Sequence, residues 1–344
     1  MLIKKSDRYV SIDICKGFLV LLMILYHCSS IIPANNINKQ YAEIITYNIS
    51  FISRYFLFLS GLICGIHYAS SYTNKFINNR LIIRGIKLLI IFFTANILIY
   101  ILQAFDLSNV FLITKEDISI KFFNIVRLSG DIYSFTILFY IGIFLILSSI
   151  LLNYIYIIFL IFSLCLLLNP KNSLILTMTY GFFGIIIGHF YKREYFSYIL
   201  NKIDYIYKIS FILIIVLLFF KNYYNPFNIL FEYKRFILLD IMINTISISI
   251  YTFSFLYILN KYQIWKPYII IFGKYSLLSY LLQMIIIRFN FKILFYFNFN
   301  FTAYYLINVI FTTVFLYVIL YLINNSRNKS PENIISKIYN LIFN

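Results

Sequence analysis

Three ionisable residues lie within one apolar stretch near the N-terminus, and their spacing brings them to one side of a helix. Asp13, Lys16 and His27 occur in SIDICKGFLVLLMILYHCSS. At about 100° per residue, Lys16 and His27 fall within roughly 20° of each other, with His27 about 16 Å further along the axis, and Asp13 falls about 40° from His27. Ionisable side chains in a membrane helix are costly, so we take all three as candidate catalytic residues, with His27 suited to proton transfer or nucleophilic attack. The alternative is that Asp13 and Lys16 snorkel to the interface while His27 caps the helix.

A second group of candidates is cationic and lies in NNRLIIRGIKLLIIFF. Arg80, Arg84 and Lys87 are spaced i, i+4 and i+7, so one helix face carries all three. Guanidinium forks match phosphate oxygens, which makes this face a candidate site for the phosphates of an anionic cytosolic cofactor. The alternative is that the three cations set topology and contact lipid headgroups.

Small and histidine residues in two other apolar runs are weaker candidates. Ser60 and Gly61 form a small pair in the middle of RYFLFLSGLICGIHYASSY, a pattern that also serves close packing of membrane helices. His67 and His189 come at the ends of their apolar runs, and we interpret both as interfacial. The four cysteines lack metal-type spacing, so no metal site is expected.

The elements that must position these residues are transmembrane helices. Of the 344 residues, 62% are hydrophobic and 12% are charged, a balance that a soluble core cannot accommodate. A hydrocarbon layer about 30 Å thick needs roughly 20 apolar residues per helix. This rule predicts an all-α, polytopic bundle of ten helices, with nine or eleven as open alternatives, at 9–32, 46–70, 82–104, 132–152, 154–169, 173–191, 206–221, 235–259, 268–288 and 302–324.

The basic residues predict the orientation of the bundle. With the N-terminus in the cytoplasm, Lys and Arg concentrate in the cytoplasmic loops, and acidic residues offset the basic ones in the longest outer loop, 105–131. Both termini are therefore expected to be cytoplasmic. The net charge of +17 has the same origin, and it forms no contiguous soluble patch for nucleic acid.

One domain is expected to contain the whole function. Residues 1–325 form the predicted transmembrane domain, and Pro331 breaks the chain beyond it. Ile334, Ile338 and Leu341 then recur at helical spacing, which predicts a short amphipathic helix on the inner leaflet within the tail, 326–344.

In order and spacing, several segments resemble the integral membrane acyltransferase-3 family, which includes polysaccharide and lipopolysaccharide O-acetyltransferases. Lys16 and His27, with ten residues between them, match the family's basic-x10-His motif in the first helix. YFLFLSGLICG is similar to its aromatic-x-x-Ser-Gly segment, and RGIKL to its Arg-x-x-Arg motif with Lys87 as the second cation. GKYSLLSYLLQ resembles a late segment that often ends in His, where this chain has Gln283. The resemblance runs from about residue 8 to residue 290.

The resemblance implies an acyltransferase for groups other than aminoacyl groups, located in the cell (inner) membrane. The donor would be cytosolic acetyl-CoA or another acyl-CoA, and the acceptor a hydroxyl of an extracytoplasmic or lipid-linked glycan. Arg80, Arg84 and Lys87 would bind the donor, with Ser60 and Gly61 beside it, and no metal is implied. His27 would act as a general base or as an acyl carrier, and Asp13 would pair with a cation such as Lys16 or Arg84.

A surface-polysaccharide polymerase or flippase is the alternative function. Such proteins share the composition and the helix number. They usually need a large outer loop or several intramembrane arginines, whereas the outer loops here are short and the basic cluster faces the cytosol. The acceptor, the acyl chain and the oligomeric state stay open.

Overall fold

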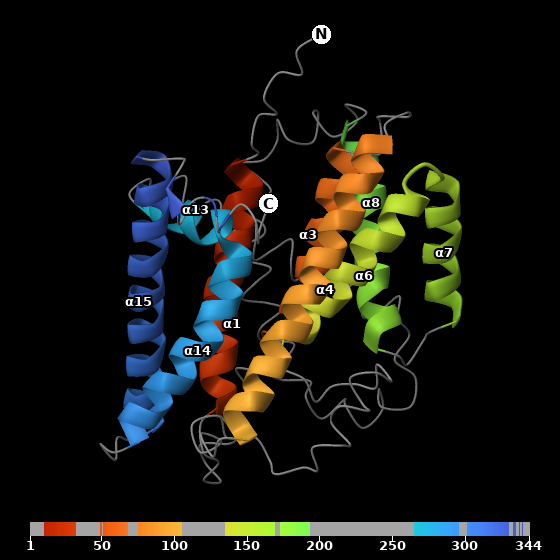
Figure 1. Cartoon of the computed structure of the whole chain (residues 1–344). Coiled ribbons are helices and arrows are strands. Elements are labelled where there is room, and N and C mark those ends of the chain that lie inside the picture. The colour runs from red at the N-terminus through yellow and green to blue at the C-terminus, as the bar shows by residue number, and fades with distance from the viewer. Residues whose placement is uncertain are drawn as a thin grey trace, which may run out of the picture. The chain divides into compact units, whose positions relative to one another are not determined.

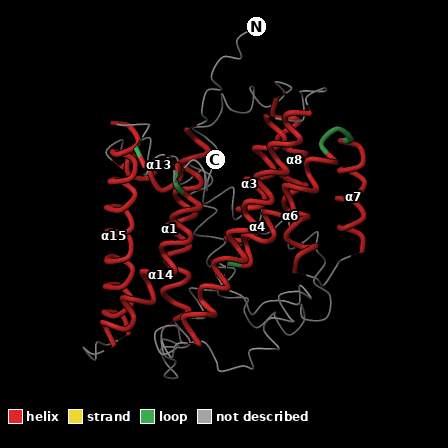
Figure 2. The backbone as a smooth tube through the Cα atoms, viewed as in Figure 1, coloured by secondary structure: helices red, strands yellow, loops and turns green. Residues whose placement is uncertain are grey.

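The chain is helical throughout the residues whose structure is described (Figures 1 and 2). In this computed structural model they are 10–31, 49, 51–67, 75–104, 135–168, 173–192, 265–295, 301–329, 333, 334, 337 and 339. Regular secondary structure within these ranges consists of helices, which confirms the all-α prediction there. The predicted spans 206–221 and 235–259 and the loop 105–131 lie outside them.

The helices begin and end close to several of the predicted spans. In chain order they are α1 (Val10–Ile31), α3 (Ile52–His67), α4 (Lys75–Ala104), α6 (Thr136–Leu151), α7 (Ile155–Leu168), α8 (Ser173–Lys192), α13 (Lys266–Lys274), α14 (Ser276–Phe295) and α15 (Phe301–Lys329). Helix α4 begins seven residues before the predicted start at 82, so all three cations of its basic face lie within one helix. Helix α15 continues five residues past the predicted end at 324.

Two of the described helices are long and apolar enough to cross a membrane. They contain the windows Ile12–Ser29 and Thr302–Asn328, and the bent pair α13–α14 makes a third if it is one span. Shorter apolar helices occupy Ile52–His67, Thr136–Leu151, Ile155–Leu166 and Leu174–Phe190. The described part of the chain thus has two or three candidate spans, which is the character of a membrane protein.

The chain divides into two compact units. Unit 1 comprises Met1–Leu59 and Tyr191–Asn344, and it contains α1, α13, α14 and α15. Unit 2 is Ser60–Phe190 and contains α4, α6, α7 and nearly all of α8. Helix α3 contributes residues to both, because the division falls between Leu59 and Ser60.

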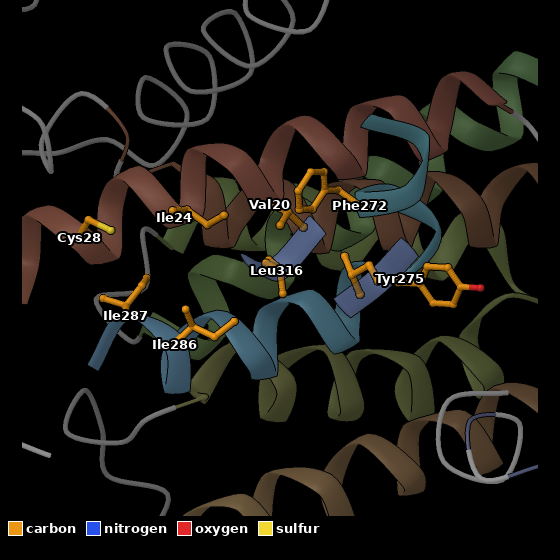
Figure 3. Close-up of a cluster of buried hydrophobic side chains, with 9 residues drawn as sticks. Val20, Ile24, Cys28, Phe272, Tyr275, Ile286, Ile287 and Leu316 are labelled. Atoms are coloured by element: carbon orange, nitrogen blue, oxygen red, sulfur yellow. The ribbon is translucent and has the colours of Figure 1, made fainter. Parts of the chain in front are cut away.

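The core of unit 1 is an apolar cluster between α1, α14 and α15. In Figure 3, Ile24 and Cys28 of α1 lie near Ile286 and Ile287 of α14, and Val20 lies beside Phe272. Helices α1 and α14 therefore run in the same direction. The cluster consists of Val20, Ile24, Cys28, Phe272, Tyr275, Ile286, Ile287, Leu316 and Leu320.

The predicted ninth span, 268–288, is broken at Tyr275. Helices α13 and α14 meet there at 90°, and α14 continues to Phe295. The break follows from packing against α1: a methyl group on Gly273 would overlap the backbone carbonyl of Asp13, and one on Gly17 would overlap the carbonyl oxygen of Ile269. Two glycines thus let α13 cross α1 in direct backbone contact.

Unit 2 also packs through glycines. A side chain at Gly61 of α3 would overlap the carbonyl oxygen of Gly181 in α8. This is the close helix packing that a small pair in a membrane helix predicts. Helix α4 packs on α6 in the same manner through Gly85 and Gly142, with Phe92 against Phe139 at a centroid distance of 5.4 Å.

Candidate functional site

Asp13 is buried where α13 crosses α1. Its side chain lies in the first turn of α1 and is 6% exposed, while Lys16, one turn later, is partly exposed. A carboxylate next to a helix N-terminus is favoured by the helix dipole. Asp13 is also the only acidic residue within the ranges that the structure describes. Its burial argues against the interpretation that this side chain simply snorkels to water.

His27 lies at the other end of the same helix. Helix α1 is continuous from Val10 to Ile31, so the predicted separation of about 16 Å between the levels of Lys16 and His27 holds. The His27 side chain is partly exposed, and its ring meets the ring of Tyr26 edge-on at 5.4 Å between centroids. The structure therefore keeps Asp13, Lys16 and His27 on one helix but at two different depths.

A buried polar cluster lies at the level of His27. Asn290 of α14 donates through Nδ2 to Thr312 Oγ1 of α15 at 3.0 Å and to Asn308 Oδ1 at 3.3 Å. Thr312 Oγ1 also donates to Asn308 Oδ1 at 3.3 Å. The thiol of Cys28, the residue after His27, lies within hydrogen-bonding reach of Thr312. We call Asn290, Asn308 and Thr312 the amide cluster.

A second polar cluster lies at the α13–α14 break, around Tyr275. The Tyr275 hydroxyl donates to Asn324 Oδ1 at 3.1 Å, and Lys274 donates to the same oxygen. Arg327 donates to the Tyr275 hydroxyl at 3.5 Å, and its guanidinium lies 4.1 Å from the ring centroid of Tyr339. Two cations and two aromatic rings therefore gather where α14 begins. We call these residues the hinge cluster.

Between the two clusters lies Gln283, the last residue of the segment GKYSLLSYLLQ. It is 0% exposed, and within the described ranges neither its Oε1 nor its Nε2 has a hydrogen-bond partner. On the helical wheel Ser279 lies about 40° and Asn290 about 20° from Gln283, so the three residues share one face of α14. Ser279 and Asn290 are also buried. The buried face of α14 therefore carries a row of polar side chains.

The predicted donor-binding residues lie in unit 2. Arg80 is exposed, and Arg84 and Lys87 are half-buried along the first half of α4. Residues 84 and 87 flank Gly85, which packs on Gly142, so α4 is held against α6 at the level of these cations. Gly61 packs against α8, and the neighbouring Ser60 is partly exposed. The predicted catalytic residues lie in unit 1, so each unit holds one of the two predicted sets.

Sequence reasoning missed the hinge cluster, the amide cluster and the burial of Gln283. A signal was available for the amide cluster, because Asn308 and Thr312 are spaced i, i+4 within an apolar run and share a helix face. Within the described ranges, no group of three His, Cys, Asp or Glu side chains is arranged to hold a metal ion. The cysteines in these ranges form no disulfide with one another, and Cys15, Cys28 and Cys64 are buried.

Comparison with models of protein families, with curated proteins and with solved structures finds no match to this chain.

Proposed function

We propose that this chain is a multi-pass O-acyltransferase of the cell (inner) membrane, of the acyltransferase-3 type. It moves an acyl group, such as acetyl, from cytosolic acyl-CoA to a hydroxyl of an extracytoplasmic or lipid-linked glycan. The observation that carries the proposal is the placement of His27. The imidazole lies on an apolar helix of membrane-spanning length, at the level of the buried amide cluster and at the opposite end of that helix from the buried Asp13.

The chemistry needs one group that accepts a proton at the acceptor hydroxyl. A neutral His27 imidazole takes that proton as the hydroxyl oxygen attacks the thioester carbonyl carbon. The new C–O ester bond forms, the C–S bond breaks, and the CoA thiolate leaves and takes up a proton. In the second route, the imidazole first accepts the acyl group from the thioester and then passes it to the hydroxyl. Both routes depend on the same side chain.

The donor enters from the cytosolic side in this proposal. Arg84 and Lys87, half-buried on α4, provide the cationic face for the phosphates of CoA, and Arg80 extends that face toward solvent. The positive-inside distribution of Lys and Arg gives the orientation, with both termini in the cytoplasm and ten helices in the whole chain. Asp13 at the N-terminal end of α1 then lies on the donor side and His27 on the acceptor side.

Transfer by the purified protein tests the proposal. The full chain is reconstituted into phosphatidylethanolamine–phosphatidylglycerol vesicles with radiolabelled acetyl-CoA and the surface glycan of the source cells, and label in the glycan is counted. We expect label that depends on the protein. Mass spectrometry of the glycan from cells lacking the gene should show the loss of one acyl mass per repeat. A change in glycan chain length with acylation intact would instead identify a polymerase or flippase.

A further inference from the structure

The amide of Gln283 is fully buried and has no hydrogen-bond partner among the residues that the structure describes. Within those residues its Oε1 accepts no hydrogen bond and its Nε2 donates none, although both atoms are shielded from solvent. A buried polar group without a partner costs roughly 1–3 kcal/mol, and more where the surroundings are apolar. In membrane helices such groups are rare and mark substrate pathways or helix contacts.

The register of α14 against α15 explains why Gln283 has no partner. The two helices are antiparallel, because Asn290 bonds to Asn308 and Thr312 while Tyr275 bonds to Asn324. Gln283 therefore lies at the level of Leu316, a fully buried residue of the apolar core. The buried α15 residue at this level, Leu316, is apolar, whereas the α15 residues of both clusters are polar.

Gln283 lies about half-way between the two polar clusters. Along the helix axis it is about 12 Å from Tyr275 of the hinge cluster and about 10 Å from Asn290 of the amide cluster. Asn308 of the amide cluster also has a buried Nδ2 that no described residue hydrogen-bonds. Two amides with unused hydrogen-bonding atoms are thus separated by roughly two helical turns inside unit 1.

The chemistry of a primary amide defines the ligand that it accepts. One edge carries an acceptor oxygen and a donor N–H₂ side by side, so a group that both donates and accepts satisfies it. Hydroxyl and amide groups have this property. A bare anion would meet the carbonyl oxygen unfavourably, and a cation would meet the N–H₂ group unfavourably. The apolar surroundings also exclude a charged ligand group at this level.

We propose that Gln283 is a substrate-binding residue whose amide hydrogen-bonds a neutral donor–acceptor group of a ligand inside unit 1, between the hinge cluster and the amide cluster. This inference rests on the proposed function, which supplies two sources of that group. One is an amide of the pantetheine arm of the acyl donor, and the other is a hydroxyl of the glycan acceptor. Asn308 would bind the same ligand through its unused Nδ2.

The test compares two variants that each remove a buried polar group without a partner. Gln283→Met keeps the length of the side chain and deletes the amide. Ser148→Ala deletes a fully buried hydroxyl in unit 2 whose Oγ also lacks a partner, and it is the matched control. Both variants should fold and unfold at the wild-type temperature or above, because neither loses a hydrogen bond within the protein.

Thermal unfolding of the full chain in maltoside micelles is measured with pantetheine and, separately, with methyl β-D-glucopyranoside. One probe should raise the Tm of the wild-type protein and of Ser148→Ala. The same probe should bind Gln283→Met roughly 5- to 100-fold more weakly, because two hydrogen bonds are lost. A response to pantetheine assigns Gln283 to the donor arm, and a response to the glucoside assigns it to the acceptor. Equal responses in Gln283→Met and wild type, or no response to either probe, would overturn the inference.

The acyl-transfer assay separates this inference from the proposed function. If the wild-type protein transfers acyl groups and Gln283→Met has an unchanged KM for both substrates, the proposed function stands and the proposed role of Gln283 is wrong. If a probe stabilises the wild-type protein but not Gln283→Met, and the wild-type protein has no transfer activity, the ligand site stands and the acyltransferase proposal is wrong.

Discussion

The two units use buried polar side chains in different ways. In unit 2, Asn96, Ser149 and Thr179 each donate to a carbonyl three or four residues earlier in their own helix. In unit 1, Asn290 and Tyr275 of the α13–α14 segment donate to side chains of α15. Local bonds satisfy a polar group without linking helices, whereas bonds between helices fix one helix against another. Among the described residues, unit 1 thus has polar bonds between helices besides local ones such as that of Ser279, and the close helix contacts described in unit 2 are made by glycines.

Glycine packing occurs in both units but has different consequences. Gly61 brings α3 against α8, and Gly85 brings α4 against α6, so these contacts set the spacing of helices. Gly273 instead brings α13 against the backbone of Asp13, a buried acid in the polar interior of unit 1. A change in this one contact therefore reaches a candidate catalytic residue, while a change at Gly85 reaches the helix that carries the candidate donor-binding cations.

The largest expected effect is at His27, and it would separate the units by function. His27→Ala should lower acyl transfer by about 10²- to 10⁴-fold, the usual contribution of a group that moves a proton in the transition state. Asp13→Asn should be less damaging, since it alters charge pairing and leaves the reacting imidazole in place. Transfer is measured with radiolabelled acetyl-CoA at matched amounts of folded protein.

His67→Ala, at the end of α3 in unit 2, is the control for His27→Ala and should retain activity. Near-normal transfer by His27→Ala would remove the general-base and acyl-carrier roles together. Loss of acyl transfer in His67→Ala but not in His27→Ala would indicate that the reacting histidine lies in unit 2.

The next largest expected effect is that of Arg84→Ala on acyl-CoA binding, and it tests whether unit 2 binds the donor. Loss of a half-buried contact between a cation and a phosphate costs about 1.5–3 kcal/mol, so Arg84→Ala should weaken acyl-CoA binding roughly 10- to 150-fold. Arg80→Ala should have a smaller effect because Arg80 is exposed and better screened by solvent. Titration calorimetry of the purified variants with CoA measures both. Unchanged CoA affinity in the double variant Arg84→Ala/Lys87→Ala would indicate that these cations serve membrane topology and lipid-headgroup contact instead.

Gly273 is expected to show a mixed effect on stability and on activity. Gly273→Val places a side chain against the Asp13 carbonyl, and overpacking of this kind costs about 1–3 kcal/mol. Gly188→Val in unit 2 meets the carbonyl of Leu62 and should lower Tm by a similar amount. Only Gly273→Val should also lower acyl transfer per folded molecule, because it displaces Asp13. Equal specific activity in the two variants would show that the α1–α13 crossing has only a structural role.

The sequence predicts the ends of some helices well because their apolar runs have sharp boundaries. The spans 9–32, 154–169 and 173–191 differ from α1, α7 and α8 by one residue at most at either end. The span 268–288 was not predicted to break, because the bend at Tyr275 depends on how Gly273 meets α1, a contact distant in sequence. Hydropathy also cannot show that α15 continues to Lys329, since polar residues extend a helix beyond the apolar layer.

For the candidate site, the spacing of Asp13, Lys16 and His27 could be predicted because it needs only a continuous helix. The unsatisfied amide of Gln283 could not be predicted from the sequence. It depends on the register that sets Leu316 opposite Gln283, and register is fixed by the polar contacts at both ends of α14. Gln283 was identified only as a departure from a family pattern, without any indication that it is buried.

The smallest expected effect concerns the amide cluster, and it tests the contrast between bonds across helices and bonds within one helix. Asn290→Leu removes the donor that links α14 to Asn308 and Thr312, whereas Thr179→Val in unit 2 removes a bond to the carbonyl of Ile175 in the same helix. Polar contacts between membrane helices contribute on average about 0.6 kcal/mol and at most about 1.7 kcal/mol, because the separated helices find other partners. Asn290→Leu should therefore lower Tm modestly, and Thr179→Val should leave it unchanged. The double variant Asn290→Leu/Asn308→Leu should recover part of the loss, since it also removes the buried Asn308 Nδ2, which has no hydrogen-bond partner among the described residues. Thermal unfolding in one detergent measures all three variants, and a larger loss in Thr179→Val than in Asn290→Leu would contradict the contrast between the two units.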